Sequence, residues 1–522
     1  MQGMSCKALL AVALAGLGGA AAAQVAGRVS GAEARNYVYV LASQPMQGRD
    51  TPSRGLDAAA LFVASKLDEW GLDPVGANPA GDPLRRFFLP IALETIVPNL
   101  QRTTARMSGH AFVYGRDFAA SGRFAGSAEG QLVFVGSSLA DNVIDVRGKI
   151  IVLPPGMEMA AAQSYAAAHG AAGIVLLPGM GQIISMLDPE AAGEMMAENS
   201  GGGMDPALAA AGLRAPRLAM TRLEAANRNP GEVPAIVAGP VLLNALFNGE
   251  KIGATKIVAS AALPDKAGPI AGFALAPEKV LRFSLAATAT PSETEDVIGL
   301  LPGSDPALKD EYVVISAHLD HLGPGFPGAD DDGSGSAGLL AMAHAFAQGA
   351  RPRRSMLFVW HAGEEKGLWG SEYLTRFPPV PLRQIVAELN LDMIGRSKPA
   401  GDTDPRDAHL ALPGEVFVIG PNLGSQSLGA VLDRVNNGYL RLSLNHYWDR
   451  AGDPDRIYYR SDQYNYARAG VPVLFFTDGL HRDYHRPTDT PEKLDYTQLE
   501  KIARTAAALA ENLANGPRLP QH

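Results

Sequence analysis

Short β-rich runs alternate with helical runs from about residue 295 to the C-terminus, and this alternation is the feature that most limits the fold. Buried strands are predicted at EYVVISA (311–317), SMLFVWHA (355–362), IVAELNLDMIG (385–395), EVFVIG (415–420) and VPVLFFTDG (471–479). Helices are predicted at SAGLLAMAHAFA (336–347), WGSEYLTRF (369–377) and LEKIARTAAALAENLA (499–514). Such alternation predicts an α/β fold with a mostly parallel mixed sheet flanked by helices.

Acidic and imidazole side chains follow these strands where the strands end. They are His318, Asp320, His321, Asp330, Asp331, Asp332, Glu364, Glu365, Asp392, His481 and His485. In open α/β sheets, the carboxyl ends of the strands form the functional edge. We therefore expect these side chains to gather at one site rich in oxygen and nitrogen donors.

Each of these features also has an ordinary structural explanation. A single His at a strand end is more often a hydrogen-bonding residue than a ligand, and Asp330–Asp332 can cap the helix that follows. Glu364–Glu365 alone is typical of a solvated turn. A calcium loop of the EF-hand type is excluded, because Gly328 and Leu339 stand where that loop needs acids. The hypothesis of a site therefore rests on the joint pattern.

The residue types favour zinc over other metals. Imidazole and carboxylate ligands without thiolate suit Zn²⁺, and the chain has one cysteine, Cys6, close to its N-terminus. Two metals need a bridging carboxylate and about two terminal ligands each, and two His with three acids meet that number. A spare carboxylate can then take a proton from water.

Five segments in order resemble the zinc-dependent exopeptidase family that includes secreted bacterial leucine aminopeptidases and glutamate carboxypeptidases. The segments are AHLDHLG, GADDDGSGSAG, HAGEEKGLWGSEYL, LNLDMIGR and DYHRPTDTPEKLD. The turn ASQPMQGRDTPSRG is similar to the N-terminal Gly-Arg turn of that family. The resemblance covers roughly residues 30–110 and 290–515.

The resemblance implies two zinc ions and assigns their ligands residue by residue. His318 would bind one ion and Asp331 would bridge both, Glu365 and Asp392 would be terminal ligands on opposite metal sides, and His485 would complete the set. It also implies a non-proline cis peptide at Asp331–Asp332. The loop PGFPG before Asp331, and Asp332 where Asn is frequent, depart from the family pattern without removing a ligand.

The resemblance implies further roles around the metals. Glu364 would be the general base, and Asp320 would hold the ring of His318. Tyr484 would stabilise the oxyanion, and Arg460 would line the substrate site.

A second domain is predicted inside the peptidase domain. GKIIVLPPG (148–156) and AHGAAGIVLLPG (168–179) resemble the protease-associated (PA) domain, a β-rich α/β module that is often inserted in such enzymes. We place this insertion at 112–285 and the peptidase domain at 24–111 and 286–522.

The N-terminus predicts export. A short basic start, an apolar run and an Ala-x-Ala exit are typical of a signal peptide over residues 1–23. Periplasm and extracellular medium are both compatible with it. After cleavage we expect no membrane association, and the formal charge of -9 disfavours nucleic-acid binding.

The function predicted from these observations is that of a secreted metallo-aminopeptidase acting on peptides. The alternatives within the fold are a carboxypeptidase or dipeptidase, which needs cations for a free carboxylate, and a one-zinc cyclising aminoacyltransferase. Candidate cations are Arg396, Arg450, Arg456 and Arg460. A catalytically inactive binding protein is the alternative from another class. The sequence assigns neither a preferred first residue nor an oligomeric state.

Overall fold

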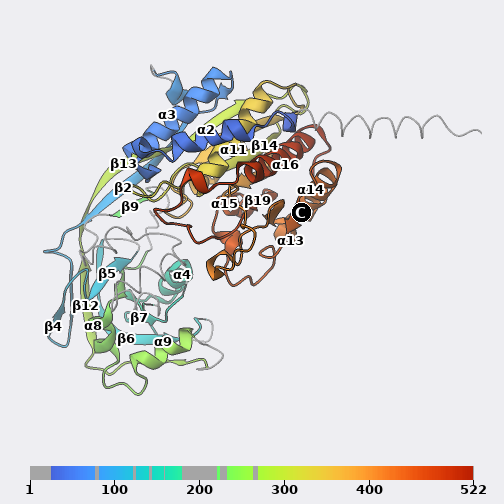
Figure 1. Ribbon diagram of the computed structural model, residues 1–522. Helices are drawn as coiled ribbons and strands as arrows, with labels where there is room; N and C mark the ends of the chain where they lie inside the picture. The colour runs from blue at the N-terminus through green and yellow to red at the C-terminus, as the bar shows by residue number, and fades with distance from the viewer. Residues whose placement is uncertain are drawn as a thin grey trace, which may run out of the picture. The chain divides into compact units, whose positions relative to one another are not determined.

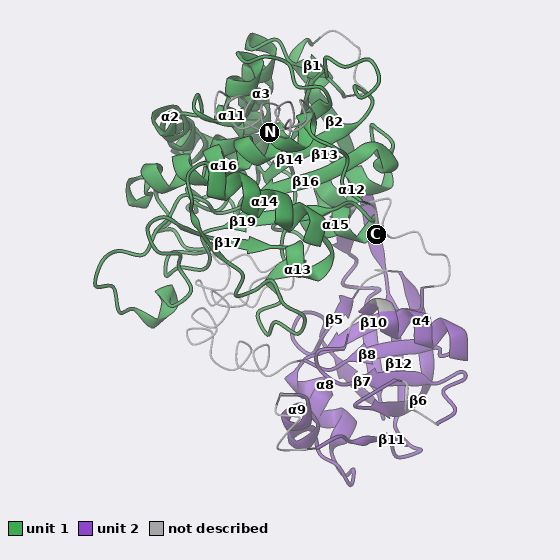
Figure 2. Ribbon diagram, turned by 90° about the vertical axis from the view of Figure 1, so that its right-hand side faces the viewer, with its two compact units in different colours: residues 1–91, 201–203, 293–522 green, residues 92–200, 204–292 purple. Residues whose placement is uncertain are grey.

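The computed structural model describes residues 25–76, 82–121, 125–139, 144–157, 159–178, 220–223, 232–262 and 268–520. The chain divides into two compact units (Figure 2). Unit 1 is residues 1–91, 201–203 and 293–522, and unit 2 is residues 92–200 and 204–292. The predicted signal peptide over 1–23 lies outside the described residues and stays a prediction. Among the described residues, no helix combines the length and hydrophobicity that a membrane span requires.

Unit 1 is built on a mixed sheet with four parallel strands at its centre. The strand order is β18-β17-β19-β16-β14-β15-β13. β19, β16, β14 and β15 run parallel, whereas β17 and β13 run antiparallel to their neighbours β19 and β15. The bounds are β13 Ala287–Leu301, β14 Tyr312–His318, β15 Ser355–His361, β16 Ile385–Leu391, β17 Glu415–Ile419, β18 Ser443–Asn445 and β19 Val473–Thr477, with β1 Asp73–Pro74 paired to β13. The predicted mostly parallel α/β fold is confirmed.

Helices cover both faces of this sheet, which explains why its central strands β14, β15 and β16 are buried along nearly their whole length. The two neighbours of β14 are β15 and β16, and each has all seven of its residues buried. On one face, α2, α11 and α16 pack together and against the sheet (Figure 1). On the other, Leu374 of α12 and Tyr466 of α15 share a cluster with Val314 of β14. The helices are α2 Gly31–Leu41, α3 Arg54–Glu69, α11 Gly333–Ala347, α12 Trp369–Arg376, α13 Pro421–Gly424, α14 Gln426–Gly438, α15 Gln463–Arg468 and α16 Tyr496–Asn515.

Short 3-10 helices connect these elements. They are η1 Gln44–Arg49, η2 Leu84–Phe87, η4 Leu382–Gln384, η5 Pro405–Asp407, η6 Ile457–Tyr459 and η7 Pro491–Lys493.

The first turn of α11 lies unusually close to the end of β16. Asp332 caps the helix, because its side chain accepts a hydrogen bond from the Gly335 N–H group. A Cβ atom at Gly335 would lie 2.1 Å from the carbonyl oxygen of Leu391, so glycine is required at this position. This approach brings the turn before α11 next to the carboxyl end of β16.

Unit 2 contains a nine-stranded sheet of order β4-β3-β12-β6-β7-β8-β10-β5, with β11 on β6. β6, β7, β8 and β10 are parallel. Alternate residues of these strands enter two separate hydrophobic clusters, one with α4 and one with α8 and α9. The bounds are β3 Thr104–Met107, β4 His110–Phe112, β5 Phe118–Ser121, β6 Gly126–Gly136, β7 Ile150–Leu153, α4 Met159–His169, β8 Gly173–Leu176, β10 Ala235–Ala238, α8 Pro240–Phe247, α9 Ala254–Ala262, β11 Ala271–Ala274 and β12 Val280–Leu285.

The chain passes between the units along two long strands, β2 (Phe88–Pro98) and β13. β2 also pairs antiparallel with β9, Met220–Leu223. The predicted insertion at 112–285 falls within unit 2, and its assignment as a PA domain stays a prediction.

Arg49 organises the loop that follows β14. Its buried guanidinium donates hydrogen bonds to four backbone carbonyls, those of Leu41 (2.6 Å), Leu319 (2.7 Å), Pro327 (3.0 Å) and Gly328 (2.9 Å). Burial lowers the pKa of Arg49, but an arginine stays charged because its usual pKa exceeds 12. The residue therefore connects the N-terminal Gly-Arg turn to the loop that carries His321.

We predict that Arg49→Met destabilises the protein by about 3–5 kcal/mol, because four buried carbonyl groups lose their donors. Thermal unfolding measures this loss, because each kcal/mol lowers the unfolding temperature by roughly 2–4 °C in a unit of this size. The control is Arg54→Met, at an exposed arginine nearby. Equal unfolding temperatures for the two variants would contradict the role of Arg49.

A second prediction concerns Glu511 in α16. Burial raises its pKa to about 7, and its Oε2 atom has no hydrogen-bond partner among the described residues. A group whose pKa is raised on folding stabilises the protein fully below the unfolded pKa, and that contribution is lost as the pH rises through the folded value. Glu511→Gln should therefore come close to wild type near pH 4 and be more stable at pH 8, by roughly 2–3 kcal/mol. Thermal unfolding at both pH values tests this. A difference independent of pH, or one shared by the exposed Glu492→Gln control, would count against it.

Candidate metal centre

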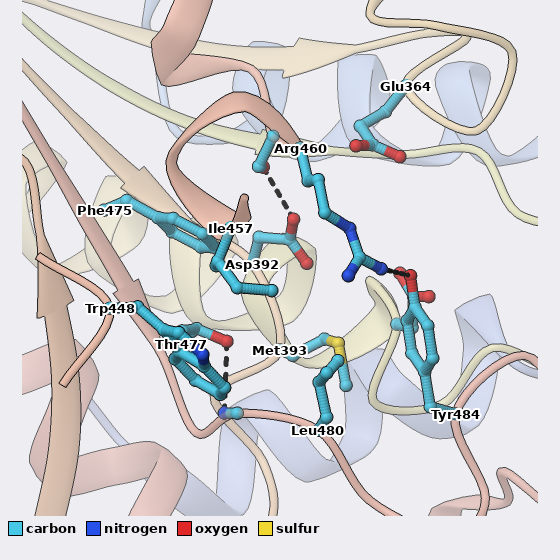
Figure 3. A pocket seen from close by; sticks show the side chains of 13 residues that line it. Glu364, Asp392, Met393, Trp448, Ile457, Arg460, Phe475, Thr477, Leu480 and Tyr484 are labelled. Carbon is cyan, nitrogen blue, oxygen red and sulfur yellow. Dashed lines mark hydrogen bonds between the residues drawn. The ribbon is translucent and has the colours of Figure 1, made fainter. Parts of the chain in front are cut away.

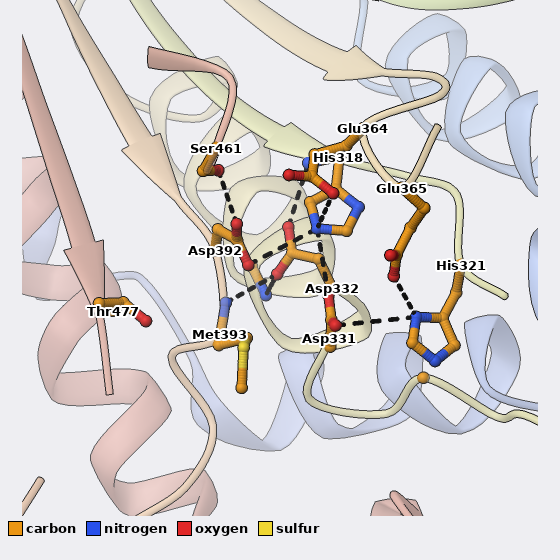
Figure 4. Close-up of polar contacts among 12 residues, drawn as sticks. His318, His321, Asp331, Asp332, Glu364, Glu365, Asp392, Met393, Ser461 and Thr477 are labelled. Carbon is orange, nitrogen blue, oxygen red and sulfur yellow. Dashed lines mark hydrogen bonds and ion pairs between the residues drawn. The ribbon is translucent and has the colours of Figure 1, made fainter. Parts of the chain in front are cut away.

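The acidic and imidazole side chains at the strand ends of unit 1 do meet at one place (Figure 4). His318 is the last residue of β14, Asp331 lies in the turn before α11, and Asp392 follows β16 directly. Glu364 and Glu365 lie in the loop after β15, and His485 lies in the loop after β19. All of them are largely buried. The tertiary structure thus brings together the whole predicted ligand set.

The first group of ligand atoms surrounds the Nε2 atom of His318. This nitrogen lies 3.2 Å from Oδ1 of Asp331 and 3.5 Å from Oδ1 of Asp392. One donor atom from each of the three residues lies within 4.8 Å of the other two, a spacing that can hold a metal ion.

The second group uses the other oxygen of the same aspartate. Nε2 of His485 lies 2.9 Å from Oδ2 of Asp331 and 3.1 Å from Oε2 of Glu365. The spacing for a metal ion is met here by donor atoms of His321, Asp331 and Glu365, and His485 contacts two of these three residues. Asp331 therefore directs one oxygen into each group, as a bridging carboxylate would.

The ring of His318 is held by the backbone carbonyl of Asp320. Its Nδ1 atom lies 3.1 Å from the carbonyl oxygen of Asp320, whereas the Asp320 carboxylate is 3.8 Å away. A carbonyl only accepts, so Nδ1 carries the proton and Nε2 keeps its lone pair for a metal. The Asp320 carboxylate instead accepts the backbone N–H of Glu364 (3.1 Å). Asp320 thus places both His318 and Glu364.

Two further residues hold ligands, and the sequence reasoning missed them. Ser461 donates to Oδ2 of Asp392 (2.6 Å) and accepts from Nδ2 of Asn390 (2.7 Å). Asp489 accepts the backbone N–H groups of Asp330 (2.9 Å) and Asp331 (3.2 Å). Asp489 belongs to the motif DYHRPTDTPEKLD, so its acidic character was a usable signal. Ser461 carried no signal beyond its place next to Arg460.

Asp332 is part of the scaffold. Its carboxylate accepts the backbone N–H groups of His318 (3.1 Å), Gly335 (2.9 Å) and Met393 (3.1 Å). The peptide bond between Asp331 and Asp332 is cis, which confirms that expectation.

Asp330 and His481, also named in the sequence, stay out of both groups. Nε2 of His481 lies 3.0 Å from Oδ2 of Asp330, so these two residues pair with each other.

The charges within the second group strongly influence one another. Burial alone would lower the pKa of His485, but the Glu365 and Asp331 carboxylates outweigh it and raise the value to about 10. Burial would raise the pKa of Glu365, yet the His485 imidazole lowers it to about 2. Protons on imidazoles thus balance buried carboxylates, and a divalent cation can replace those protons. Oxygen and imidazole donors without sulfur fit Zn²⁺.

Glu364 faces the same space without belonging to either group. Its Oε2 atom lies 4.0 Å from Nε2 of His318, and burial raises the pKa of its carboxyl group well above the usual value. A buried carboxyl group that is not a ligand is suited to take up a proton.

Arg460 and Tyr484 meet in the same pocket as Glu364 and Asp392 (Figure 3). Arg460 donates from Nη2 to the Tyr484 hydroxyl oxygen (3.1 Å), and the Tyr484 ring stacks on His485 with centroids 3.8 Å apart. Burial raises the pKa of Tyr484 well above its usual value, so the hydroxyl stays protonated and can donate.

A pocket opens over the two groups. Asp331, Glu364 and Asp392 line it together with Arg460 and Tyr484. Its remaining wall is mostly apolar and includes Met393, Trp448, Ile457, Phe475 and Leu480.

The structure separates the four arginines that were candidates for a carboxylate pocket. Arg460 lines the pocket over the metal groups. Arg396 is paired with Asp483 at 2.9 Å, and Arg450 and Arg456 line a different cavity.

Comparison with known proteins gives the fold and the family. Residues 296–510 match the model of Peptidase family M28. A "Probable leucine aminopeptidase" of Arthroderma otae is 28% identical over 225 residues, which is 40% of this chain and 56% of that protein. An "Aminopeptidase" of Pseudomonas aeruginosa is 31% identical over 183 residues, or 34% of this chain and 30% of that protein. The chain thus spans about half or less of the length of these curated relatives.

The structure of an aminopeptidase from Aneurinibacillus sp. strain AM-1 shares the fold across both units. The match has a TM-score of 0.56 at 17% identity and covers 96% of this chain and 98% of that one. The solved structure supports the fold, and the match to the family model identifies residues 296–510 as a domain of peptidase family M28, the zinc exopeptidases that its motifs resemble.

Proposed function

We propose that this protein is an exported metallo-aminopeptidase that removes N-terminal residues from peptides with two zinc ions. The observation that carries the proposal is the placement of Asp331, whose Oδ1 faces His318 and whose Oδ2 faces His485. Two ligand groups that share one carboxylate can hold two metals a short distance apart, as two-metal hydrolases require.

The proposed ligands divide between the two groups. His318 and Asp392 would hold one ion, and Glu365 and His485 would hold the other. Asp331 would be a ligand of both ions. When bound, the ions supply a Lewis acid for the substrate carbonyl and lower the pKa of the attacking water.

Glu364 would act as the general base. It would accept the proton of the water and return it to the amine that leaves. The backbone N–H of Glu364 is held by Asp320, so the carboxyl group starts from a defined position. Its neighbour Glu365 is engaged by His485, which supports the division of the adjacent acids into base and ligand.

Tyr484 would donate a hydrogen bond to the oxyanion that forms on the substrate. The guanidinium of Arg460 already donates to the Tyr484 oxygen, which leaves the hydroxyl proton free to point at the substrate. Arg460 would thus act mainly by orienting Tyr484.

The pocket supports the aminopeptidase over the carboxypeptidase. Glu364 and Asp392 supply negative charge for a free α-amine, and the apolar wall suits an apolar first side chain. Arg460 is the observation that favours the alternative, since a cation in the pocket can bind a free carboxylate.

Export and the role of unit 2 belong to the same proposal. The signal peptide over 1–23 would deliver the protein to the periplasm or the medium. Unit 2 would be the PA domain, which is supported by its parallel β6-β7-β8 core with α4 between β7 and β8.

The substrate class is tested with zinc-loaded protein and three peptides. Leu-Gly-Gly and its C-terminal amide should be cleaved, N-acetyl-Leu-Gly-Gly should not, and a chelator should abolish cleavage. Liberated leucine is measured by chromatography. If the acetylated peptide is cleaved and the C-terminal amide is not, the aminopeptidase proposal is wrong. That result would support a carboxypeptidase in which Arg460 binds the free carboxylate.

Glu364→Gln should lower kcat by about 10²- to 10⁴-fold while the protein keeps its zinc, because the base is lost and the ligands remain. Steady-state kinetics and metal analysis of the same preparation measure both. Glu372→Gln in α12, away from the pocket lining, is the matched control and should behave as wild type. An active Glu364→Gln variant would show that the base is another group.

A further inference from the structure

We propose that His321 is a positioning residue that holds one oxygen of Glu365 by a hydrogen bond and leaves the other for the metal. This role rests on the proposed two-metal function. Nδ1 of His321 lies 2.8 Å from Oε1 of Glu365 (Figure 4). Nε2 of His485 lies 3.1 Å from Oε2 of the same carboxylate. The two histidines therefore use different oxygens of one carboxylate.

Geometry distinguishes His321 from a ligand. Nε2 of His485 lies within 3.1 Å of both Asp331 and Glu365. Nδ1 of His321 is 3.9 Å from Oδ2 of Asp331 and is already engaged by Glu365. Because a carboxylate accepts, the bond to Glu365 places a ring proton on Nδ1 of His321. His485 contacts both carboxylates of the second group at metal-ligand positions, whereas His321 contacts only Glu365 at hydrogen-bond distance.

The ring of His321 is held in place from several sides. Its backbone N–H donates to the carbonyl oxygen of Arg49 (3.1 Å). A Cβ atom at Gly328 would lie 2.5 Å from Cγ and Cδ2 of the ring, so the loop packs directly on the imidazole. Its side chain is fully buried, and the ring meets that of His485 edge to face with centroids 5.8 Å apart. The Arg49 network and the candidate metal group are thus connected through one side chain.

The consequence is a carboxylate of fixed orientation. With Oε1 occupied by a donor, Glu365 presents a single oxygen and cannot rotate freely. Hydrogen bonds of this kind to metal ligands typically change metal affinity by about 10- to 100-fold.

The test compares His321→Leu, which removes the donor, with His321→Asn, whose amide can donate from near the Nδ1 position. The matched control is His344→Leu, because Nδ1 of His344 also pairs with a glutamate, Glu33, at 2.7 Å. Zinc is removed from the full chain and titrated back against a competing chelator. The Co²⁺-substituted forms are compared by their visible absorption.

We expect wild type and His344→Leu each to bind two equivalents of zinc, with the same two affinities in both proteins. His321→Leu should weaken one of the two ions by about 10- to 100-fold and change the Co²⁺ spectrum, and His321→Asn should restore both toward wild type.

Two results would overturn the role of His321 while wild type still binds two ions. Unchanged binding in His321→Leu would show that the hydrogen bond is dispensable. Loss of one full equivalent in both His321 variants would make His321 a ligand. Wild type that binds fewer than two ions would instead overturn the proposed two-metal function and this role with it.

Discussion

Burial of several carboxylates at one edge of a sheet is the constraint on which the rest of unit 1 depends. Like charges in a poorly solvated space repel, and each loses hydration. The chain meets this cost by interleaving acids and imidazoles, so that Asp331 lies between His318 and His485. Burial would raise the pKa of Asp331, but the two imidazoles hold it well below its usual value. The buried carboxylates of a site arranged in this way can bind cations.

Several nearby acids serve a different purpose from the ligands. Asp320, Asp332 and Asp489 mainly accept backbone N–H groups of the loops that carry the ligands. Burial raises the pKa of Asp320 to about 7. These three residues show that an acidic residue can lie next to a candidate metal group without being a ligand. What separates the two classes is the direction in which each carboxylate points.

Support for the site extends outward to the N-terminal turn. Arg49 holds the loop after β14 by four carbonyls, and its own carbonyl accepts the N–H of His321. His321 then contacts Glu365. A turn more than 250 residues away in the sequence thereby bears on the orientation of one candidate ligand. Loss of Arg49 would therefore lower both the free energy of unfolding and the affinity for metal.

The order of strands and helices, and the acids and histidines at the strand ends, could be predicted from the sequence alone. Apolar runs such as those of β14 and β16 have few alternatives, and parallel strands place their carboxyl ends at one edge. His318, Asp331 and Asp392 were found for that reason. Ser461 and His321 were not assigned roles, because their contribution depends on which atom of a partner they reach. The contact of His318 with the Asp320 carbonyl, and the two oxygens of Glu365 divided between two histidines, were decided by tertiary packing. Hydrogen bonds are short and directional, so the spacing of residues along a chain does not determine them.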